Sequence, residues 1–250
     1  MVAKGSKEKV AKFHRAVRAA LNPLKNPERA AGMRAYMRDQ FVYLGVGTPE
    51  HRAAVAPLIR AFDPASAEEL RIAATGLWAM REREYQYVAV GLLNRHHAVL
   101  SINDLPWLLD LVQQKSWWDT VDSLVKVVGK IVQRSGAKGG RAMDRAIGHR
   151  DFWVRRIAML HQLGLRGDTD TERLFHYAEL LAAEKEFFIR KAIGWALRDH
   201  AWHDWQAVDK FLKGTNAPLS GLTLREARKN FATLQKLPGS PHLTRRRRSS

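Results

Sequence analysis

Residues 151–158 read Asp-Phe-Trp-Val-Arg-Arg-Ile-Ala, and related segments stand at Ser116-Trp-Trp-Asp and at Glu186-Phe-Phe-Ile-Arg-Lys-Ala-Ile. The three segments begin 35 residues apart, at positions 116, 151 and 186. Each begins with a residue that caps a helix or complements its positive end, and two aromatic residues and a helical pattern follow. Because one pair of helices cannot bury its own apolar face, a helical unit repeated at this period indicates stacked helix pairs.

The rest of the chain has helical periodicity almost throughout. Near the start, Val10, Phe13, Val17 and Leu21 recur at the spacing of one helix face. The apolar run at 42–44 is too short to build a sheet. We therefore predict an all-α protein: a right-handed α-solenoid of HEAT-like antiparallel helix pairs with a concave basic groove.

Capping signals place the individual helices. Asn26 and Pro27 form a typical helix start, and the helix that follows is expected to continue to Phe41. Residues 135–141 are rich in glycine and are interpreted as a loop between helices. Helices are also predicted at about 6–21, 49–62, 66–79, 82–96, 103–114, 117–133, 141–148, 151–163, 171–183, 186–201, 204–213 and 220–234.

The charge of the chain indicates its kind of partner. Lysine and arginine number 42 against 25 acidic residues, which gives a net charge of +17. Only four of these positive charges lie in Arg245–Arg248, so the excess belongs mainly to the rest of the chain. A strongly basic protein favours a polyanion, and nucleic acid is the first expectation. The alternative is a basic protein whose charge serves only solubility.

Other classes of protein are excluded by composition. The chain has no cysteine, which rules out disulfide scaffolds, cysteine-ligated metals and cysteine nucleophiles. It has no apolar run of roughly 18 residues and no secretory signal, so we expect an intracellular, cytoplasmic protein without a membrane span. The histidine pairs His96, His97 and His200, His203 have no accompanying metal motif and are interpreted as surface residues. We expect neither a metal nor a cofactor.

We predict one domain over residues 1–236. Residues 237–250 combine proline, glycine, serine and arginine, and we expect them to be a disordered basic tail. The tail either adds non-specific affinity for DNA or serves only solubility. A groove within one solenoid needs no second chain, so we expect a monomer.

The segment that begins at Ser116 carries the first candidate site. Trp117, Val121 and Leu124 fall on one apolar stripe of the predicted helix. Asp119 stands where an acid bonds back to the Ser116 cap, so a structural role is sufficient for it.

Trp118 and Asp122 form a separate row on the same predicted helix. They lie four residues apart and are therefore neighbours, about a quarter turn from the apolar stripe. A large aromatic ring beside a carboxylate is an unusual choice for packing. The alternative is a half-buried tryptophan next to a solvated aspartate.

A second row lies near the end of the chain. Lys191, Trp195 and Arg198 share one face of a predicted helix. A tryptophan between two cations suits contact with phosphate and sugar. The alternative is an exposed edge on which the lysine and arginine stems cover the ring.

Several segments resemble one known family. They span residues 10–230 in the family's order, and the third and fifth are long and specific. They are Arg34-Ala-Tyr-Met-Arg with Phe41-Val-Tyr-Leu-Gly-Val-Gly-Thr-Pro-Glu; Leu77-Trp with Arg81-Glu-Arg-Glu-Tyr; Lys115-Ser-Trp-Trp-Asp-Thr-Val-Asp-Ser; Trp153-Val-Arg-Arg-Ile-Ala; and Lys185-Glu-Phe-Phe-Ile-Arg-Lys-Ala-Ile-Gly-Trp-Ala-Leu-Arg. In these segments the chain resembles the AlkD-like DNA alkylation repair glycosylases, which are built of HEAT-like repeats.

The resemblance implies an activity and a set of site residues. The family hydrolyses the N-glycosidic bond of cationic 3- and 7-alkylated purines in double-stranded DNA, without drawing the base into a pocket. The family's catalytic aspartate falls on Asp122 and its two lesion-side tryptophans on Trp118 and Trp195. Its DNA-contacting residues match Tyr36, Arg156 and Arg198, and Lys191 joins them from the row described above.

The implied chemistry needs few groups. An alkylated purine already carries a positive charge and leaves readily, while positive charge develops on the deoxyribose as the bond stretches. One carboxylate and neighbouring indole rings stabilise such a sugar. The expected function is thus a DNA glycosylase for 3-methyladenine, 7-methylguanine and bulkier adducts. The alternative is a non-catalytic module that binds DNA or a protein.

Overall fold

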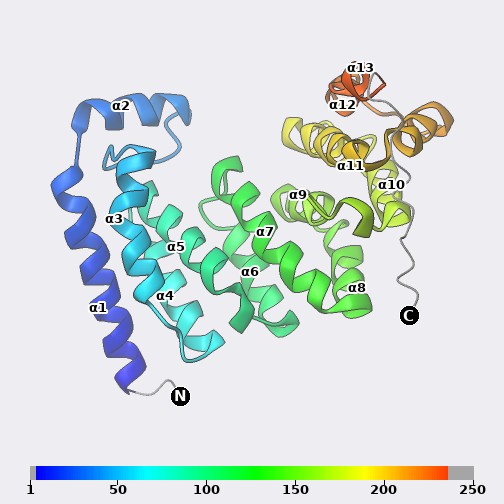
Figure 1. Cartoon of the computed structure of the whole chain (residues 1–250). Coiled ribbons are helices and arrows are strands. Elements are labelled where there is room, and N and C mark those ends of the chain that lie inside the picture. Colours follow the sequence, from blue (N-terminus) through cyan, green and yellow to red (C-terminus); the bar gives the residue numbers. More distant parts are fainter. Residues whose placement is uncertain (1–3, 236–250) are drawn as a thin grey trace, which may run out of the picture. The chain divides into compact units, whose positions relative to one another are not determined.

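The computed structural model describes residues 4–235, and within this range the chain forms no β-sheet (Figure 1). One isolated bridge between Val42 and Glu82 is the only extended pairing in that range. The prediction of an all-α protein is therefore confirmed. Contacts divide the chain into two compact units, Met1–Gly140 and Arg141–Ser250. The solenoid's hand and its basic groove remain predictions.

The first unit contains seven complete helices among its described residues, and the helix α8 crosses into the second unit. They are α1 (Lys4–Leu21), α2 (Pro27–Tyr36), α3 (Thr48–Ala61), α4 (Ala67–Ala79), α5 (Arg83–His96), α6 (Leu105–Val112), α7 (Trp118–Arg134) and α8 (Gly136–Ala146).

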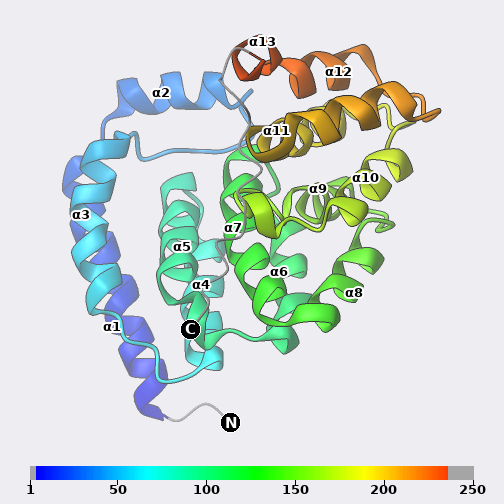
Figure 2. The same ribbon diagram turned by 45° about the vertical axis from the view of Figure 1, so that its right-hand side comes forward.

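The core of the first unit follows the predicted periodicity. On α1 the side chains of Val10, Phe13, Val17 and Leu21 are all buried, which confirms the predicted stripe. Helix α1 packs on both α3 and α4, and α4 packs on α5 (Figure 2). Helices α5 and α6 both contact α7, so the helix that begins at Trp118 is held from two directions.

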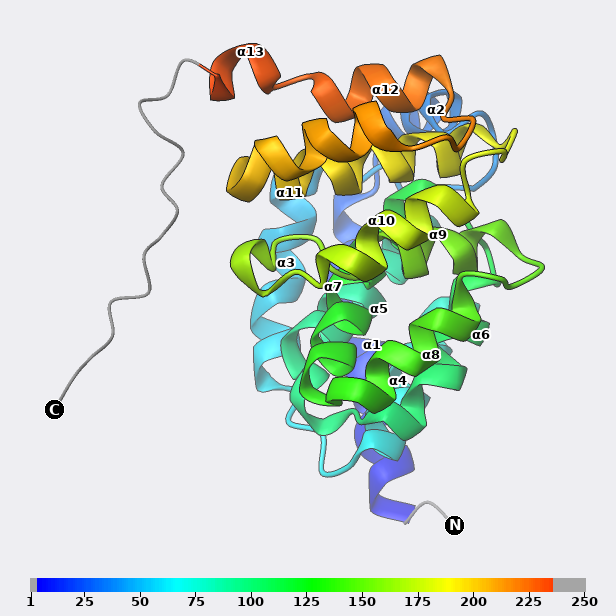
Figure 3. The same ribbon diagram turned by 90° about the vertical axis from the view of Figure 1, so that its right-hand side faces the viewer.

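The second unit is built around one long helix. Its helices are α9 (Phe152–Leu160), α10 (Thr171–Leu180), α11 (Phe187–Gly214), α12 (Gly221–Arg228) and α13 (Phe231–Leu234). Helix α11 contacts α9, α10 and α13 and runs along α12 (Figure 3). The backbone of Asp204 is not helical, so α11 consists of two helices joined at a kink, close to the boundary predicted between 201 and 204.

The repeated segments do begin helices, but only two of the three predicted caps form. The Asp151 carboxylate accepts a hydrogen bond from the backbone of Trp153, and Glu186 accepts one from Phe188. Ser116 does not cap α7, because its hydroxyl donates to the Val112 carbonyl instead.

Two other local predictions are wrong. Helix α2 ends at Tyr36 rather than Phe41, because Arg38 and Asp39 adopt left-handed backbone conformations that break a helix. The glycine-rich segment 135–141 is mostly helical, because α8 begins at Gly136. Gly136 itself has a positive φ. Its backbone packs closely, and a Cβ on Gly139 would overlap the main chain of Val132.

His200 is buried, which contradicts its interpretation as a surface residue. Its ring lies edge-on to Phe175, with 6.5 Å between centroids. Burial lowers the pKa of His200, so it packs as a neutral ring.

None of the helices within residues 4–235 combines the length and the apolar character that crossing a bilayer requires. The proposed tail at 237–250 lies outside the described residues.

Candidate functional site

Tyr36 and Trp118 lie together in the first unit, although they are far apart in sequence. Their rings meet edge to face with 6.2 Å between centroids, a favourable aromatic geometry. Tyr36 is the last residue of α2 and is 73% exposed, whereas Trp118 is half-buried at the start of α7. Most of the tyrosine ring therefore faces solvent beside a tryptophan.

Asp122 follows Trp118 one turn further along α7. Residues four apart on a helix are neighbours on one face, so the carboxylate and the indole share a side of α7. The side chain of Asp122 is half-buried. The apolar stripe of the same helix is buried at Val121, Leu124 and Val128, so the Trp118 and Asp122 row is distinct from the core, as predicted. Trp117, predicted in that stripe, is only half-buried.

The loop after α2 is fixed by a buried glutamate on α5. The carboxylate of Glu84 accepts hydrogen bonds from the backbone N–H groups of Leu44, Gly45 and Val46, at 3.0, 2.8 and 3.2 Å. Gly45 has a φ of +84°, and a Cβ there would overlap the Asn26 carbonyl. Glycine is therefore required where this loop turns under α2.

The residue before Glu84 fixes the start of α7. Arg83 is wholly buried, and its guanidinium donates to both carboxylate oxygens of Asp119, at 2.9 and 2.5 Å. It also donates to the Lys115 carbonyl at 2.8 Å and to the Thr120 hydroxyl at 2.9 Å. The ring of Phe41 covers the guanidinium at 3.7 Å, which adds a cation–π contact.

Two adjacent residues of one helix thus join two distant parts of the site. Glu84 holds the loop that follows Tyr36, and Arg83 holds the first turn of α7, where Trp118 begins the helix. The backbone N–H of Arg83 also donates to the Val42 carbonyl in that loop, at 2.9 Å. Helix α5 is therefore the common support of the tyrosine and the tryptophan.

Two tyrosines extend this polar network. The hydroxyl of Tyr87 donates a hydrogen bond to the Asp119 carboxylate at 2.7 Å, and the hydroxyl of Tyr43 lies 3.3 Å from that of Tyr87. Burial raises the pKa of Tyr43 to about 12, and burial also raises the pKa of Tyr87. Both hydroxyls are thus protonated at neutral pH, which keeps Tyr87 a donor to the carboxylate.

The remaining predicted residues lie in the second unit. On α11, Lys191, Trp195 and Arg198 occupy one row, and both cations bond to Glu226 of α12. Burial by itself raises the pKa of Glu226, but the hydrogen bonds from Lys191 and Arg198 outweigh it and lower the pKa below its usual value. Glu226 was not identified from the sequence.

Arg156 of α9 is buried in the second unit. Its guanidinium donates to the Phe188 carbonyl and lies about 6 Å from the rings of Phe188 and Trp195, at 5.9 and 6.0 Å. Arg156 therefore connects α9 to the row on α11 that carries Trp195.

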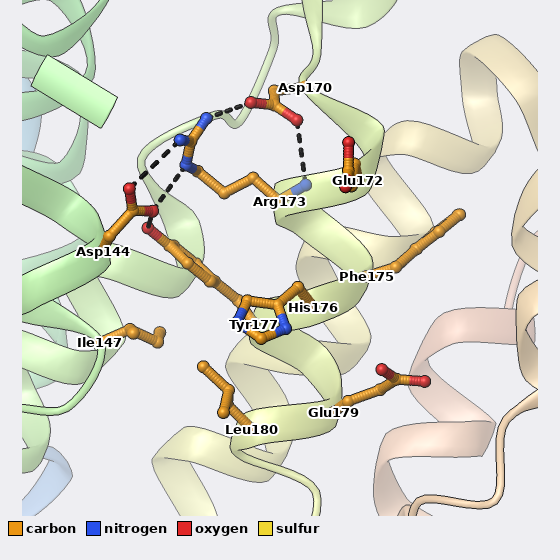
Figure 4. A pocket seen from close by; sticks show the side chains of 10 residues that line it. All are labelled: Asp144, Ile147, Asp170, Glu172, Arg173, Phe175, His176, Tyr177, Glu179 and Leu180. Atoms are coloured by element: carbon orange, nitrogen blue, oxygen red, sulfur yellow. Dashed lines mark hydrogen bonds and ion pairs between the residues drawn. The ribbon is translucent and has the colours of Figure 1, made fainter. Parts of the chain in front are cut away.

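A pocket of about 760 Å³ opens beside α10 in the second unit (Figure 4). Arg173 stands between Asp144 and Asp170 and pairs with both, while the hydroxyl of Tyr177 donates to Asp144 at 2.6 Å. The single guanidinium is already shared by two carboxylates, and Glu172 and Glu179 also line the pocket. This pocket therefore does not suit a polyanion.

The network around Arg83 was also missed from the sequence. The sequence shows two adjacent charged residues, Arg83 and Glu84, at the start of a predicted helix, but periodicity shows neither that they are buried nor which partners they bind. Across residues 4–235, no group of three or more histidine or acidic side chains is arranged to hold a metal.

The chain is similar to proteins of known family and structure. The sequence profile of the family described as "DNA alkylation repair enzyme" matches residues 17–231. A solved structure from Enterococcus faecalis, described as a predicted DNA alkylation repair enzyme, is 34% identical, with a TM-score of 0.77. The match covers 83% of this chain and 97% of that one. No protein with a curated function matches the chain.

Two more distant structures share the fold. AlkD2 from Streptococcus mutans is 17% identical with a TM-score of 0.56, over 73% of this chain and 89% of that one. The alkylpurine DNA glycosylase AlkC from Pseudomonas fluorescens, bound to DNA containing an abasic site analog, is 13% identical with a TM-score of 0.54. That match covers 91% of this chain and 66% of that one.

Proposed function

Because this chain belongs to the family of DNA alkylation repair enzymes, we propose that it is a monofunctional DNA glycosylase. Its substrates are cationic 3- and 7-alkylated purines in duplex DNA, and it hydrolyses their N-glycosidic bond. The observation that carries the proposal is the shared face of Trp118 and Asp122 on α7, beside the exposed ring of Tyr36. The net charge of +17 supports DNA as the partner.

In this reaction the bond between C1′ of the deoxyribose and the purine nitrogen breaks. The alkylated base is cationic, so it takes the bonding electrons and leaves as a neutral molecule without first being protonated. Positive charge develops on the sugar, and water then adds to C1′ and loses a proton. The base does not need to enter an enclosing pocket, so adducts of different size fit the same chemistry.

Asp122 is assigned to stabilise the cationic sugar. Two unit charges about 4 Å apart interact by about 4 kcal/mol at an effective dielectric of about 20. Since 1.36 kcal/mol corresponds to one decade in rate, this interaction is worth about a thousandfold. A neutral base, which must be protonated to leave, would not be released at a comparable rate.

The indole of Trp118 is assigned to the same sugar, because the face of an aromatic ring attracts positive charge. Trp195 takes the corresponding role among the residues of the second unit. Tyr36, Lys191 and Arg198 are assigned to the DNA backbone, where hydroxyl and cationic groups position the duplex. Arg156, expected from the resemblance to contact DNA, is buried in this structure, so we assign it to position the Trp195 ring.

The test is release of free base from methylated duplex DNA. We expect wild-type protein to release 7-methylguanine and 3-methyladenine, and Asp122→Asn to keep duplex affinity within about twofold while losing about a thousandfold in rate. Asp110→Asn is the matched control, because Asp110 is an exposed carboxylate on α6 and its removal changes the net charge equally.

Two results would overturn the assignment. Full activity of Asp122→Asn would remove the proposed mechanism. Duplex binding by wild-type protein with no base released from any alkylated purine would identify a non-catalytic binding module. If wild-type protein does release alkylated bases, a panel of lesions that ranges from methyl groups to bulky adducts defines its substrate range.

A further inference from the structure

Glu226 lies between the two cations that were expected to bind DNA in the second unit. One of its carboxylate oxygens accepts from the Lys191 ammonium at 3.2 Å, and the other accepts from the Arg198 guanidinium at 2.5 Å. Lys191 and Arg198 lie two turns apart on α11, and Glu226 reaches them from α12. A single carboxylate thus bridges both ends of the row that carries Trp195.

The position of Glu226 is fixed by close helix packing. A Cβ on Gly194 would lie 2.5 Å from the Cβ of Glu226 and 2.9 Å from the Thr223 carbonyl, so only glycine allows α12 to approach this closely. The Thr223 hydroxyl also donates to the Arg190 carbonyl at 3.1 Å, which ties α12 to α11 a second time. The carboxylate therefore has little freedom to move away from the cations.

The three side chains differ in exposure. The side chain of Glu226 is 16% exposed, whereas that of Arg198 is 21% and that of Lys191 is 39% exposed. An ammonium has three N–H donors and a guanidinium five, and Glu226 accepts one from each. A phosphate that approaches from solvent would therefore meet cationic donors in front of a fixed negative charge.

We propose that Glu226 limits the affinity of this surface for undamaged DNA by holding Lys191 and Arg198 as a partly neutralised pair. The inference rests on the proposed function, because it assigns these two cations to the DNA backbone. The pair carries a net charge of +1 with Glu226 and +2 without it. A repair enzyme that must leave intact duplex to find rare lesions gains from such a limit, since non-specific affinity follows the number of neutralised phosphates.

The experiment compares Glu226→Gln with wild type on an undamaged duplex. The amide keeps the shape and acceptor oxygen of the side chain but removes its charge. We expect about fivefold tighter binding at low salt, which corresponds to about 1 kcal/mol. The slope of log affinity against log salt should also become steeper, by up to about 0.9 for one further phosphate neutralised.

Glu172→Gln is the matched control. Glu172 is an exposed residue in the first turn of α10, and its removal raises the net charge by the same amount. We expect it to change duplex affinity by less than about twofold, because it releases neither Lys191 nor Arg198, both of which pair with Glu226. Glu226→Gln that binds no more tightly than Glu172→Gln overturns the inference.

A second variant covers the case in which the amide disturbs folding. Glu226→Met removes the charge and fills a similar volume, and it should tighten binding in the same way. Thermal unfolding verifies that a variant used for binding is folded. If wild-type protein shows no salt-dependent duplex binding, the proposed function fails together with this inference. If wild type binds duplex and releases alkylated bases while both Glu226 variants bind like wild type, only this inference fails.

Discussion

Arg83 donates hydrogen bonds to both carboxylate oxygens of Asp119, from a position in which the guanidinium side chain is 0% and the carboxylate side chain 8% exposed. The pair joins the start of α5 to the first turn of α7. Asp119 was expected to have a structural role at the start of this helix. It does have one, but its partner is an arginine 36 residues earlier in the chain rather than the serine cap.

The first prediction concerns this buried ion pair. Asp119→Asn should lower the free energy of unfolding by about 3 kcal/mol, because it leaves the Arg83 guanidinium buried without its counter-charge. Urea unfolding measures the change. Asp39→Asn is the control, since Asp39 pairs with Arg34 at the surface and its loss should cost less than about 1 kcal/mol. Equal effects of the two substitutions would contradict the assigned importance of the buried pair.

The second prediction concerns the contact between α11 and α12. Gly194→Ala should destabilise the protein by about 1–2 kcal/mol, because the added methyl group overlaps the side chain of Glu226 and the Thr223 carbonyl. Gly32→Ala should stabilise it by about 0.5–1 kcal/mol, because Gly32 lies in α2 with no atom within 4 Å of its Cβ position. Opposite signs in thermal unfolding would confirm the close packing, and a stabilising Gly194→Ala would contradict it.

The third prediction separates function from stability at Tyr36. Because the side chain is 73% exposed, Tyr36→Ala should change the free energy of unfolding by less than about 0.5 kcal/mol. Its affinity for duplex DNA should fall about fivefold or more, because the proposed hydrogen bond from the tyrosine hydroxyl to the DNA and one aromatic contact of the ring are lost. Fluorescence anisotropy with a labelled duplex measures this, and Tyr36→Phe isolates the hydroxyl. Unchanged affinity of Tyr36→Ala would remove Tyr36 from the interface.

The fourth prediction concerns pH. Burial lowers the pKa of His161 to about 4, below its ordinary value of 6.5. Below pH 6.5 the unfolded chain therefore takes up a proton that the folded protein refuses, so stability falls as the pH drops from about 6.5 to about 4. From this residue alone, the free energy of unfolding should be about 2 kcal/mol lower at pH 5 than at pH 7.5.

The control for this pH effect is His161→Asn, whose amide can replace the hydrogen bond from the ring nitrogen to the Ala158 carbonyl. His14, His51 and His200 also have lowered pKa values caused by burial, so some acid sensitivity will remain in the variant. The difference between wild type and variant isolates His161. An identical loss of stability between pH 7.5 and pH 5 in both proteins would contradict the prediction.

Helix positions were largely predictable because the apolar period is a local property. The stripe at Val10, Phe13 and Val17 is buried as expected. Predictions of helix ends failed where the backbone adopts a conformation that the apolar period does not indicate. Arg38 has a left-handed conformation after the end of α2, and Gly136 has a positive φ where α8 begins. His200 was predicted at the surface because histidine has polar ring atoms. Desolvation lowers its pKa, so the ring is neutral and can be buried.

The sequence by itself determined that the protein is helical, that it is basic, and that Trp118 stands beside Asp122. Residues four apart in a helix are neighbours on one face, so the row of Trp118 and Asp122 can be identified without knowledge of the fold. Only the tertiary structure decided that Tyr36 meets Trp118 and that Glu226 joins Lys191 to Arg198. Such partners lie on helices distant in sequence, and their meeting depends on how closely those helices pack, which a local pattern does not encode.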